Sequence, residues 1–197
     1  ESVQNALKDV IDPNTGKDLL STKSALNIKL EGSNVSLDVE LAYPAKSQIE
    51  PMKKAVTARL RQIAGIGEVR VAVSSRIVAH SVQRGVKLIP GVKNIIAVAS
   101  GKGGVGKPTT AVNLALALAA EGAKVGVLDA DIYGPSQPMM LGITGTPHSE
   151  DGKALEPMKG HGIEAMSIGF RIDIDTPMVW RGPMVTQALE QLIRDTK

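Results

Sequence analysis

The chain has 197 residues, with 23 basic against 20 acidic side chains and a formal net charge of +3. It contains no cysteine, which excludes disulfides and thiolate metal sites within these residues and suits a cytoplasmic protein. No segment approaches the roughly 18 consecutive apolar residues of a membrane helix. The basic residues are scattered and only four side chains are aromatic, so we expect neither a membrane nor a nucleic-acid partner.

The first 75 residues show the pattern of a small α+β domain. Two stretches alternate between apolar and polar residues on either side of a turn, which predicts an antiparallel hairpin. Apolar residues at helical spacing lie before and after this hairpin. The expected elements are a helix at 3–10, strands at 26–30 and 35–41, a helix at 48–64 and a strand at 69–73.

Residues 76–93 form the expected linker between two domains, because glycine and proline interrupt them and four basic residues keep them hydrated. We therefore predict domains at 1–75 and 94–197. The three histidines of the chain stand apart from other ligand residues, so none of them predicts a metal site.

One stretch of the second half carries a chemical signature. An apolar run at 95–99 predicts a buried strand, a glycine-rich loop follows at 101–107, and a helix is expected at 109–120. A second buried strand is predicted at 124–128. Strand, glycine loop, helix and strand together are the context that a phosphate-binding loop requires.

The loop has the spacing Gly-x4-Gly-Lys, beginning at Gly101. Glycines let consecutive N–H groups point into an anion-binding nest, and the helix that starts there adds its dipole. Lys107 supplies a positive charge for the β- and γ-phosphates. A glycine-rich turn without a ligand is the alternative interpretation. The predicted phosphate-binding residues are Gly101, Lys102, Gly103, Gly104, Val105, Gly106, Lys107, Pro108 and Thr109.

Pro108 departs from the phosphate-loop pattern, which has serine or threonine after the lysine. Proline is sterically acceptable in a first helical turn, but it lacks the hydroxyl that binds Mg²⁺ and the N–H that would face phosphate. Thr109 lies one residue further on, where a helix rotates the side chain by about 100°. We predict weakened binding of the Mg²⁺–nucleotide complex and slow or absent hydrolysis.

Two carboxylates follow the second predicted strand. Asp129 and Asp131 lie at its carboxyl end, which is where open α/β sheets bind ligands. Aspartates that cap a turn are the alternative interpretation. Beyond them we expect a loop at 132–146, a strand at 163–168 and a helix at 183–195.

Several segments extend the loop motif into a specific resemblance. GKGGVGK, residues 101–107, resembles the deviant Walker A motif of the MinD/ParA-like ATPases. LDADIYGPSQPMMLG (128–142), HGIEAMSIGF (161–170) and VWRGPMVTQALEQL (179–192) resemble the Mrp/ApbC family of iron–sulfur cluster carrier ATPases. Residues 1–80 are similar to the small domain, resembling iron–sulfur assembly factors, that precedes the ATPase in many members.

The resemblance implies ATP and Mg²⁺ as cofactors and roles for charged residues. Asp129 would help to hold the hydration shell of Mg²⁺, and Asp131 would orient or activate the attacking water. Lys102 would reach the phosphates of the opposite subunit in a homodimer and stabilise the transition state there, as an arginine finger does. A solvent-facing Lys102 is the alternative.

The resemblance further implies a carrier that hydrolyses ATP and passes iron–sulfur clusters to apoproteins, with assembly factors as further partners. The family's Walker B strand and its Cys-x-x-Cys would come after residue 197, so we expect 94–197 to be the N-terminal half of the ATPase domain. The expected fold is α/β, a small α+β domain and then a P-loop NTPase domain with a mostly parallel sheet, truncated before Walker B. A MinD/ParA-type partitioning ATPase and, because of Pro108, a non-hydrolysing nucleotide-dependent scaffold are the alternatives.

Overall fold

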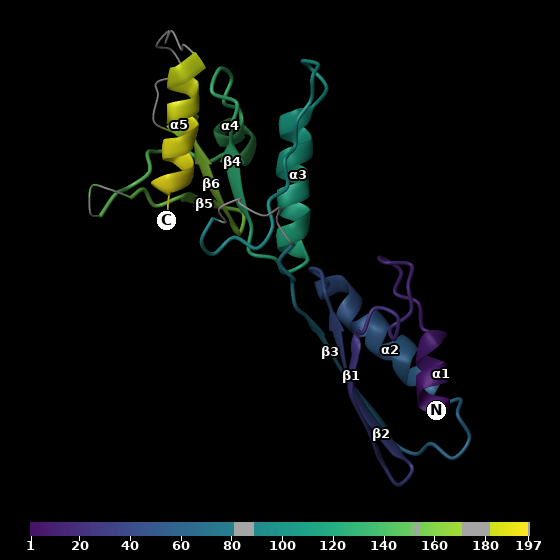
Figure 1. The fold of residues 1–197 in the computed structure, drawn as a ribbon. Coiled ribbons are helices and arrows are strands. Elements are labelled where there is room, and N and C mark those ends of the chain that lie inside the picture. The colour runs from purple at the N-terminus through teal and green to yellow at the C-terminus, as the bar shows by residue number, and fades with distance from the viewer. Residues whose placement is uncertain (81–88, 151, 153, 171–181, 197) are drawn as a thin grey trace. The chain divides into compact units, whose positions relative to one another are not determined.

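The computed structural model describes residues 1–80, 89–150, 152, 154–170 and 182–196. The chain divides into two compact units, Glu1–Ile95 (unit 1) and Ile96–Lys197 (unit 2), and Figure 1 shows the elements of each. The boundaries predicted for the linker stay a prediction, and residues 81–88 of that segment lie outside the described part. No helix of the described residues is long and apolar enough to span a membrane.

Unit 1 has the predicted order of helix, two strands, helix and strand. Its three-stranded sheet has the order β1-β2-β3, with β1 antiparallel and β3 parallel to β2. The elements are α1 (Ser2–Lys8), β1 (Ala25–Glu31), β2 (Asn34–Leu41), the 3-10 turn η1 (Lys46–Gln48), α2 (Ile49–Leu60) and β3 (Val69–Ser75).

One face of this sheet carries a hydrophobic core. β2 alternates strictly between buried and more exposed residues, so that its valines and leucines all point to one side. α1 and α2 cover that side, as Figure 1 shows. The core combines Val3, Ala6 and Leu7 of α1, Val35, Leu37, Val39 and Leu41 of β2, Met52, Val56 and Leu60 of α2, and Val69 and Val71 of β3.

The alternation predicted for β1 is interrupted by a β-bulge. Leu26 pairs with Asp38 and Lys29 pairs with Ser36, so β1 uses one more residue than β2 between these pairs. Asn27 takes a φ of 51° inside the bulge. As a consequence Leu26 lies on the open face of the sheet and is 39% exposed, which corrects the single apolar face expected for this strand.

Unit 2 has its own three-stranded sheet, with the order β4-β6-β5. β4 runs parallel to β6, and β5 is antiparallel to it. The elements are α3 (Lys107–Ala120), β4 (Gly126–Asp129), α4 (Gln137–Leu141), β5 (Met158–Gly160), β6 (Ile163–Ser167), the 3-10 turn η2 (Ile168–Phe170) and α5 (Gly182–Arg194). The α/β class is confirmed, as are the predicted strand at 163–168 and helix at 183–195.

Helices cover both faces of the unit 2 sheet. Ile163 and Ala165 of β6 pack with Val112 and Ala115 of α3 in one cluster. Met166 belongs to a second cluster on the other face, where the apolar side of α5 packs. Figure 1 shows α3 and α5 on opposite sides of the strands. β6 is therefore the central, most deeply buried strand of unit 2.

The apolar run at 95–99 is not a strand, which corrects the prediction. Residues 91–100 have no helix or strand, and Ile95 and Ile96 are 71% and 60% exposed. A strand buried on both faces requires neighbours that complete its hydrogen bonds and cover its side chains. None of the described strands pairs with this run, and most of its residues are exposed. β4 is also less buried than predicted, with Leu128 39% exposed.

Candidate functional site

The glycine loop and the helix after it form as the sequence predicts. Gly104 and Gly106 have φ values of 74° and 84°, which residues with a side chain rarely adopt. Gly106 is the N-cap residue of α3, and the N–H of Thr110 donates to its carbonyl oxygen at 2.9 Å. At the other end, Gly122 and Ala123 donate to carbonyl oxygens of the last turn in a Schellman motif.

The loop backbone is open to a ligand. A Cβ atom built on Gly101, Gly103, Gly104 or Gly106 would meet no atom within 4 Å. This free space lies beside N–H groups at the positive end of a 14-residue helix. The glycines of the loop are therefore not covered by other parts of the described chain.

Lys107, Pro108 and Thr109 form the first turn of α3. Lys107 and Pro108 are half-buried and Thr109 is exposed. Pro108 occupies the second helical position, where its missing N–H breaks no hydrogen bond within the helix. The turn is regular, but at residue 108 it presents a pyrrolidine ring in place of a hydroxyl.

Asp129 lies buried at the carboxyl end of β4, with 5% of its surface exposed. Its Oδ2 accepts hydrogen bonds from the N–H groups of Ser136 and Gln137, both at 3.0 Å, and from the Ser167 hydroxyl at 3.2 Å. Its Oδ1 accepts a hydrogen bond from the N–H of Asp131 at 3.1 Å. The carboxylate thus holds together the ends of β4 and β6 and the segment that leads into α4.

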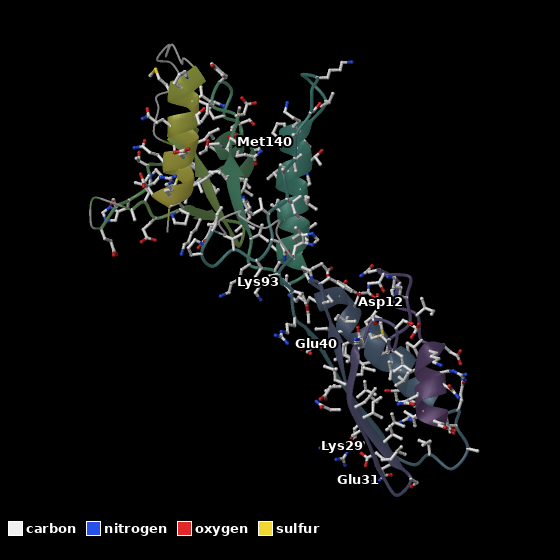
Figure 2. The ribbon with its side chains drawn as sticks, viewed as in Figure 1. Asp12, Lys29, Glu31, Glu40, Lys93 and Met140 are labelled. Atoms are coloured by element: carbon white, nitrogen blue, oxygen red, sulfur yellow. The ribbon has the colours of Figure 1, made fainter. Side chains whose placement is uncertain are left out.

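The segment 132–146 contains the short helix α4, although the sequence predicted only a loop. Pro138 lies in the first turn of α4, a position that tolerates proline. The Asp129 carboxylate accepts hydrogen bonds from the N–H groups of Ser136 and Gln137 at the start of this helix, seven and eight residues further along the chain. Met139 and Met140 of α4 are 79% and 39% exposed, and Figure 2 labels Met140.

Gln137 connects the two predicted parts of the site, and sequence reasoning missed it. Its side-chain Nε2 donates to the Pro108 carbonyl oxygen at 3.3 Å, while its backbone N–H binds Asp129. The residue is 4% exposed. A lone glutamine in a predicted loop carries no sequence signal, so only the tertiary structure could reveal this bridge.

The other predicted residues are more peripheral. Asp131 is exposed, and its Oδ1 accepts a hydrogen bond from the N–H of Gly134 at 3.1 Å. Lys102 is exposed, and its backbone exchanges hydrogen bonds with the Ser100 hydroxyl at 3.0 and 3.1 Å. The structure therefore brings Pro108 and Asp129 together through Gln137, and leaves Lys102 at the surface of the loop.

The described residues around the start of α3 and the end of β4 include no set of protein ligands that would enclose a metal ion. No group of three or more histidine, cysteine, aspartate or glutamate side chains among the described residues could hold a metal ion. Asp129 has four donors on its two oxygens, and the buried Oε1 of Gln137 has no hydrogen-bond partner among the described residues. Mg²⁺ retains several waters in nucleotide sites and is held through them and the phosphates.

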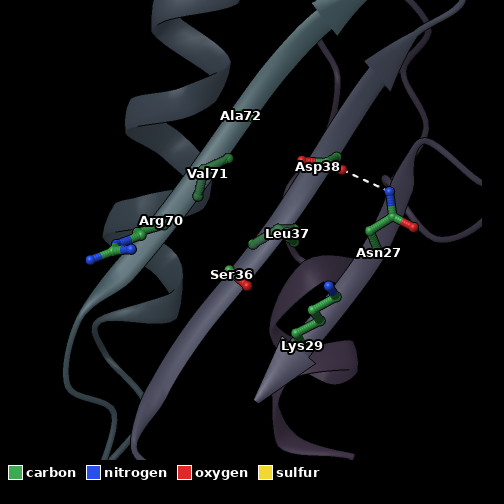
Figure 3. A pocket seen from close by; sticks show the side chains of 8 residues that line it. All are labelled: Asn27, Lys29, Ser36, Leu37, Asp38, Arg70, Val71 and Ala72. Carbon is green, nitrogen blue, oxygen red and sulfur yellow. Dashed lines mark hydrogen bonds between the residues drawn. The ribbon is translucent and has the colours of Figure 1, made fainter. Parts of the chain in front are cut away.

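Unit 1 offers a shallow polar groove on the open face of its sheet, shown in Figure 3. Asn27 donates to Oδ2 of Asp38 at 2.7 Å, and Lys29 and Arg70 lie in the same lining. Arg70 binds Glu68 through two hydrogen bonds of 2.9 and 3.0 Å. The hydrogen bond and the charge of Arg70 lower the pKa of Glu68, and the hydrogen bond and the charge of Glu68 raise the pKa of Arg70. Asn27 with Asp38 and Arg70 with Glu68 thus form two hydrogen-bonded pairs at the exposed surface.

A second polar pair in unit 1 has a structural function. Asp12, labelled in Figure 2, is 3% exposed. Its Oδ1 accepts hydrogen bonds from the Tyr43 hydroxyl at 2.7 Å and from the N–H of Asn14 at 2.9 Å. Asp12 therefore fastens the loop after α1 to the segment after β2.

Comparison with known proteins agrees with both halves of this description. Residues 91–197 match the family profile of the NUBPL iron-transfer P-loop NTPases, and residues 1–73 match that of an iron–sulfur cluster assembly protein. An iron–sulfur cluster carrier protein of Haemophilus influenzae is 42% identical over 195 residues, which cover 98% of this chain and 53% of that protein. One from Escherichia coli K12 is 51% identical over 164 residues, 82% of this chain and 44% of that protein.

A solved nucleotide-binding protein from Archaeoglobus fulgidus, in complex with ADP, is 36% identical. The matched region covers 50% of this chain and 37% of the Archaeoglobus fulgidus chain. The TM-score of 0.41 is too low to support the fold assignment. The sequence matches define a P-loop NTPase preceded by an iron–sulfur assembly domain. The chain belongs to the NUBPL iron-transfer P-loop NTPase family, which confirms the resemblance found in the sequence. It spans about half the length of the curated relatives it matches.

Proposed function

We propose that this chain is the ATP-binding part of a cytoplasmic iron–sulfur cluster carrier. The observation that supports this is the open glycine loop at the start of α3, in a chain whose family is that of iron-transfer P-loop NTPases. The N–H groups of Gly101–Gly106 and the positive end of α3 bind the β- and γ-phosphates, and Lys107 neutralises part of their charge. Mg²⁺ supplies further charge neutralisation when it is bound.

Hydrolysis requires a water oxygen to attack the γ-phosphorus while the bond to the β–γ bridging oxygen breaks and ADP leaves. In this proposal Asp131 orients the water, because its exposed carboxylate is anchored through its own N–H to the buried Asp129. Lys102 acts on the phosphates of a second subunit in a homodimer, for which its exposure at the loop surface is suitable. Because Pro108 lacks the hydroxyl that serine or threonine would offer to Mg²⁺, ATP hydrolysis by this chain is slow.

The cargo is an iron–sulfur cluster delivered to apoproteins, as the names of the relatives indicate. Such clusters are held mainly by cysteine thiolates, which these 197 residues do not contain. We therefore assign to this chain the nucleotide-dependent part of the function and no cluster ligand. Pro108 also favours a second candidate, a nucleotide-dependent scaffold without turnover, which phosphate release after Pro108→Ser distinguishes from a slow ATPase.

Calorimetry of ATP binding in the presence of Mg²⁺ tests the proposal. The chain should bind ATP, and Lys107→Ala should weaken binding at least tenfold, because a lysine–phosphate contact is worth about 1.5–3 kcal/mol. Lys124→Ala, an exposed lysine outside the loop, is the matched control and should leave the affinity unchanged. No binding by the unchanged chain, or equal binding by both variants, would contradict the proposal.

A further inference from the structure

Gln137 is the residue whose chemistry the phosphate loop leaves unexplained. It is 4% exposed, and its Oε1 has no hydrogen-bond partner among the described residues. An enclosed acceptor without a donor is unfavourable, and a methionine or leucine of similar size would avoid it. The described residues supply no donor to this oxygen, which makes it a candidate acceptor for a group that a bound ligand brings.

The amide is held at the start of α3. Its Nε2 donates to the Pro108 carbonyl oxygen at 3.3 Å, and because both amide atoms share one carbon, Oε1 also lies beside this turn. The backbone N–H of Gln137 donates to Oδ2 of Asp129 at 3.0 Å. Gln137 thus lies between the residue that follows the loop lysine and the buried aspartate.

We propose that Gln137 is a positioning residue for the hydrated Mg²⁺ that accompanies the nucleotide. Oε1 accepts a hydrogen bond from a water of the cation's shell, and the bond from Nε2 to Pro108 keeps the amide oriented. Pro108 offers neither a hydroxyl nor an N–H here, so an amide oxygen from α4 fulfils part of that missing function. The proposal rests on the proposed function, because it requires a nucleotide at the loop.

Calorimetry with and without the cation provides the test. ATP affinity is measured in Mg²⁺ and in EDTA for the unchanged chain and for Gln137→Met, with Gln137→Leu as a second variant in case one of them folds poorly. The gain in affinity that Mg²⁺ confers should fall about 3- to 10-fold, as for the loss of one hydrogen bond. Affinity in EDTA should stay within about twofold, and the melting temperature without ligand should stay equal or rise.

Gln187→Met, an exposed glutamine of α5, is the matched control and should leave every value unchanged. An unchanged Mg²⁺ gain in Gln137→Met, or an equal loss of affinity in Mg²⁺ and EDTA, would overturn the proposal in favour of a merely structural role. Failure of the unchanged chain to bind ATP would contradict the proposed function itself. The two failures are therefore distinguishable.

A double-mutant cycle with Pro108→Ser tests the compensation directly. Once a hydroxyl stands at position 108, the effect of Gln137→Met on the Mg²⁺ gain should shrink to less than about twofold, because the serine oxygen serves the cation. An equally large effect in both backgrounds would contradict the idea that Gln137 compensates for Pro108.

Discussion

Unit 1 and unit 2 bury their apolar residues in different ways. In unit 1 one face of a sheet and two helices share one core cluster, and β2 is buried at every second residue. In unit 2 the buried residues divide between two clusters on opposite faces of the sheet. Ile95, at the end of unit 1, and Ile96, at the start of unit 2, belong to neither arrangement and are exposed.

The difference shows where local pattern suffices and where it does not. A sheet with one covered face reveals its burial through alternation, because the partner strand and the covering helix follow within a few tens of residues. The strand predicted at 95–99 would be buried on two faces, so its state depends on neighbours distant in the sequence. Variants in each unit test this difference.

The largest effect should come from opening the unit 1 core. Leu60→Ala removes a fully buried side chain of α2 and should lower the free energy of unfolding by about 2–5 kcal/mol. Leu114→Ala in α3, where the side chain is 37% exposed, should cost less than about 1 kcal/mol. Urea unfolding followed by circular dichroism measures both, and equal losses would contradict the different burial of these two side chains.

Pro108→Ser, in unit 2, should strengthen the binding of ATP in the presence of Mg²⁺. The serine hydroxyl restores an oxygen to the cation, which should raise Mg²⁺-dependent ATP affinity about tenfold, the equivalent of about 1.4 kcal/mol. Calorimetry measures the change. Thr109→Ala in the unchanged chain is the control, and a tenfold loss from that variant would mean that Thr109 already serves in place of a residue-108 hydroxyl.

Ile96→Thr should change the free energy of unfolding by less than about 0.5 kcal/mol, because the side chain is 60% exposed. The matched variant Val39→Thr places a hydroxyl in the unit 1 core and should lose about 1–3 kcal/mol. Thermal or urea unfolding compares the pair. A loss of several kcal/mol from Ile96→Thr would show that 95–99 is packed as a strand in solution.

The smallest effect concerns pH. The pKa of Glu68 is lowered by its hydrogen bond to Arg70 and by the charge of that residue, and both groups are at the surface. A lowered pKa in the folded chain means that the pair stabilises above the ordinary value near 4.5 and loses this contribution as pH falls through the folded pKa. Arg70→Gln should raise the Glu68 pKa in an NMR titration, and Arg61→Gln should leave it lowered.

Much of the site was predictable because it depends on local chemistry. Gly104 and Gly106 adopt left-handed conformations that glycine favours. The loop leads directly into α3, which begins at Lys107. The bulge in β1 was not predictable, since Leu26 and Leu30 alternate regularly in the sequence. It depends on pairing with β2, which shifts by one residue between Leu26 and Lys29.

Resemblance of sequence motifs predicted the family. Spacing, glycine content and periodicity predicted the order of elements in unit 1 and the glycine loop before α3, because these patterns act over short distances. Tertiary packing buries Asp129 beneath four hydrogen-bond donors, allows α4 to form and brings the Gln137 side chain to the Pro108 carbonyl. The contacts from Asp129 to Ser167 and from Gln137 to Pro108 join residues 38 and 29 positions apart, which lie in different strands and helices. Their partners are chosen by how the chain packs, which no local pattern encodes.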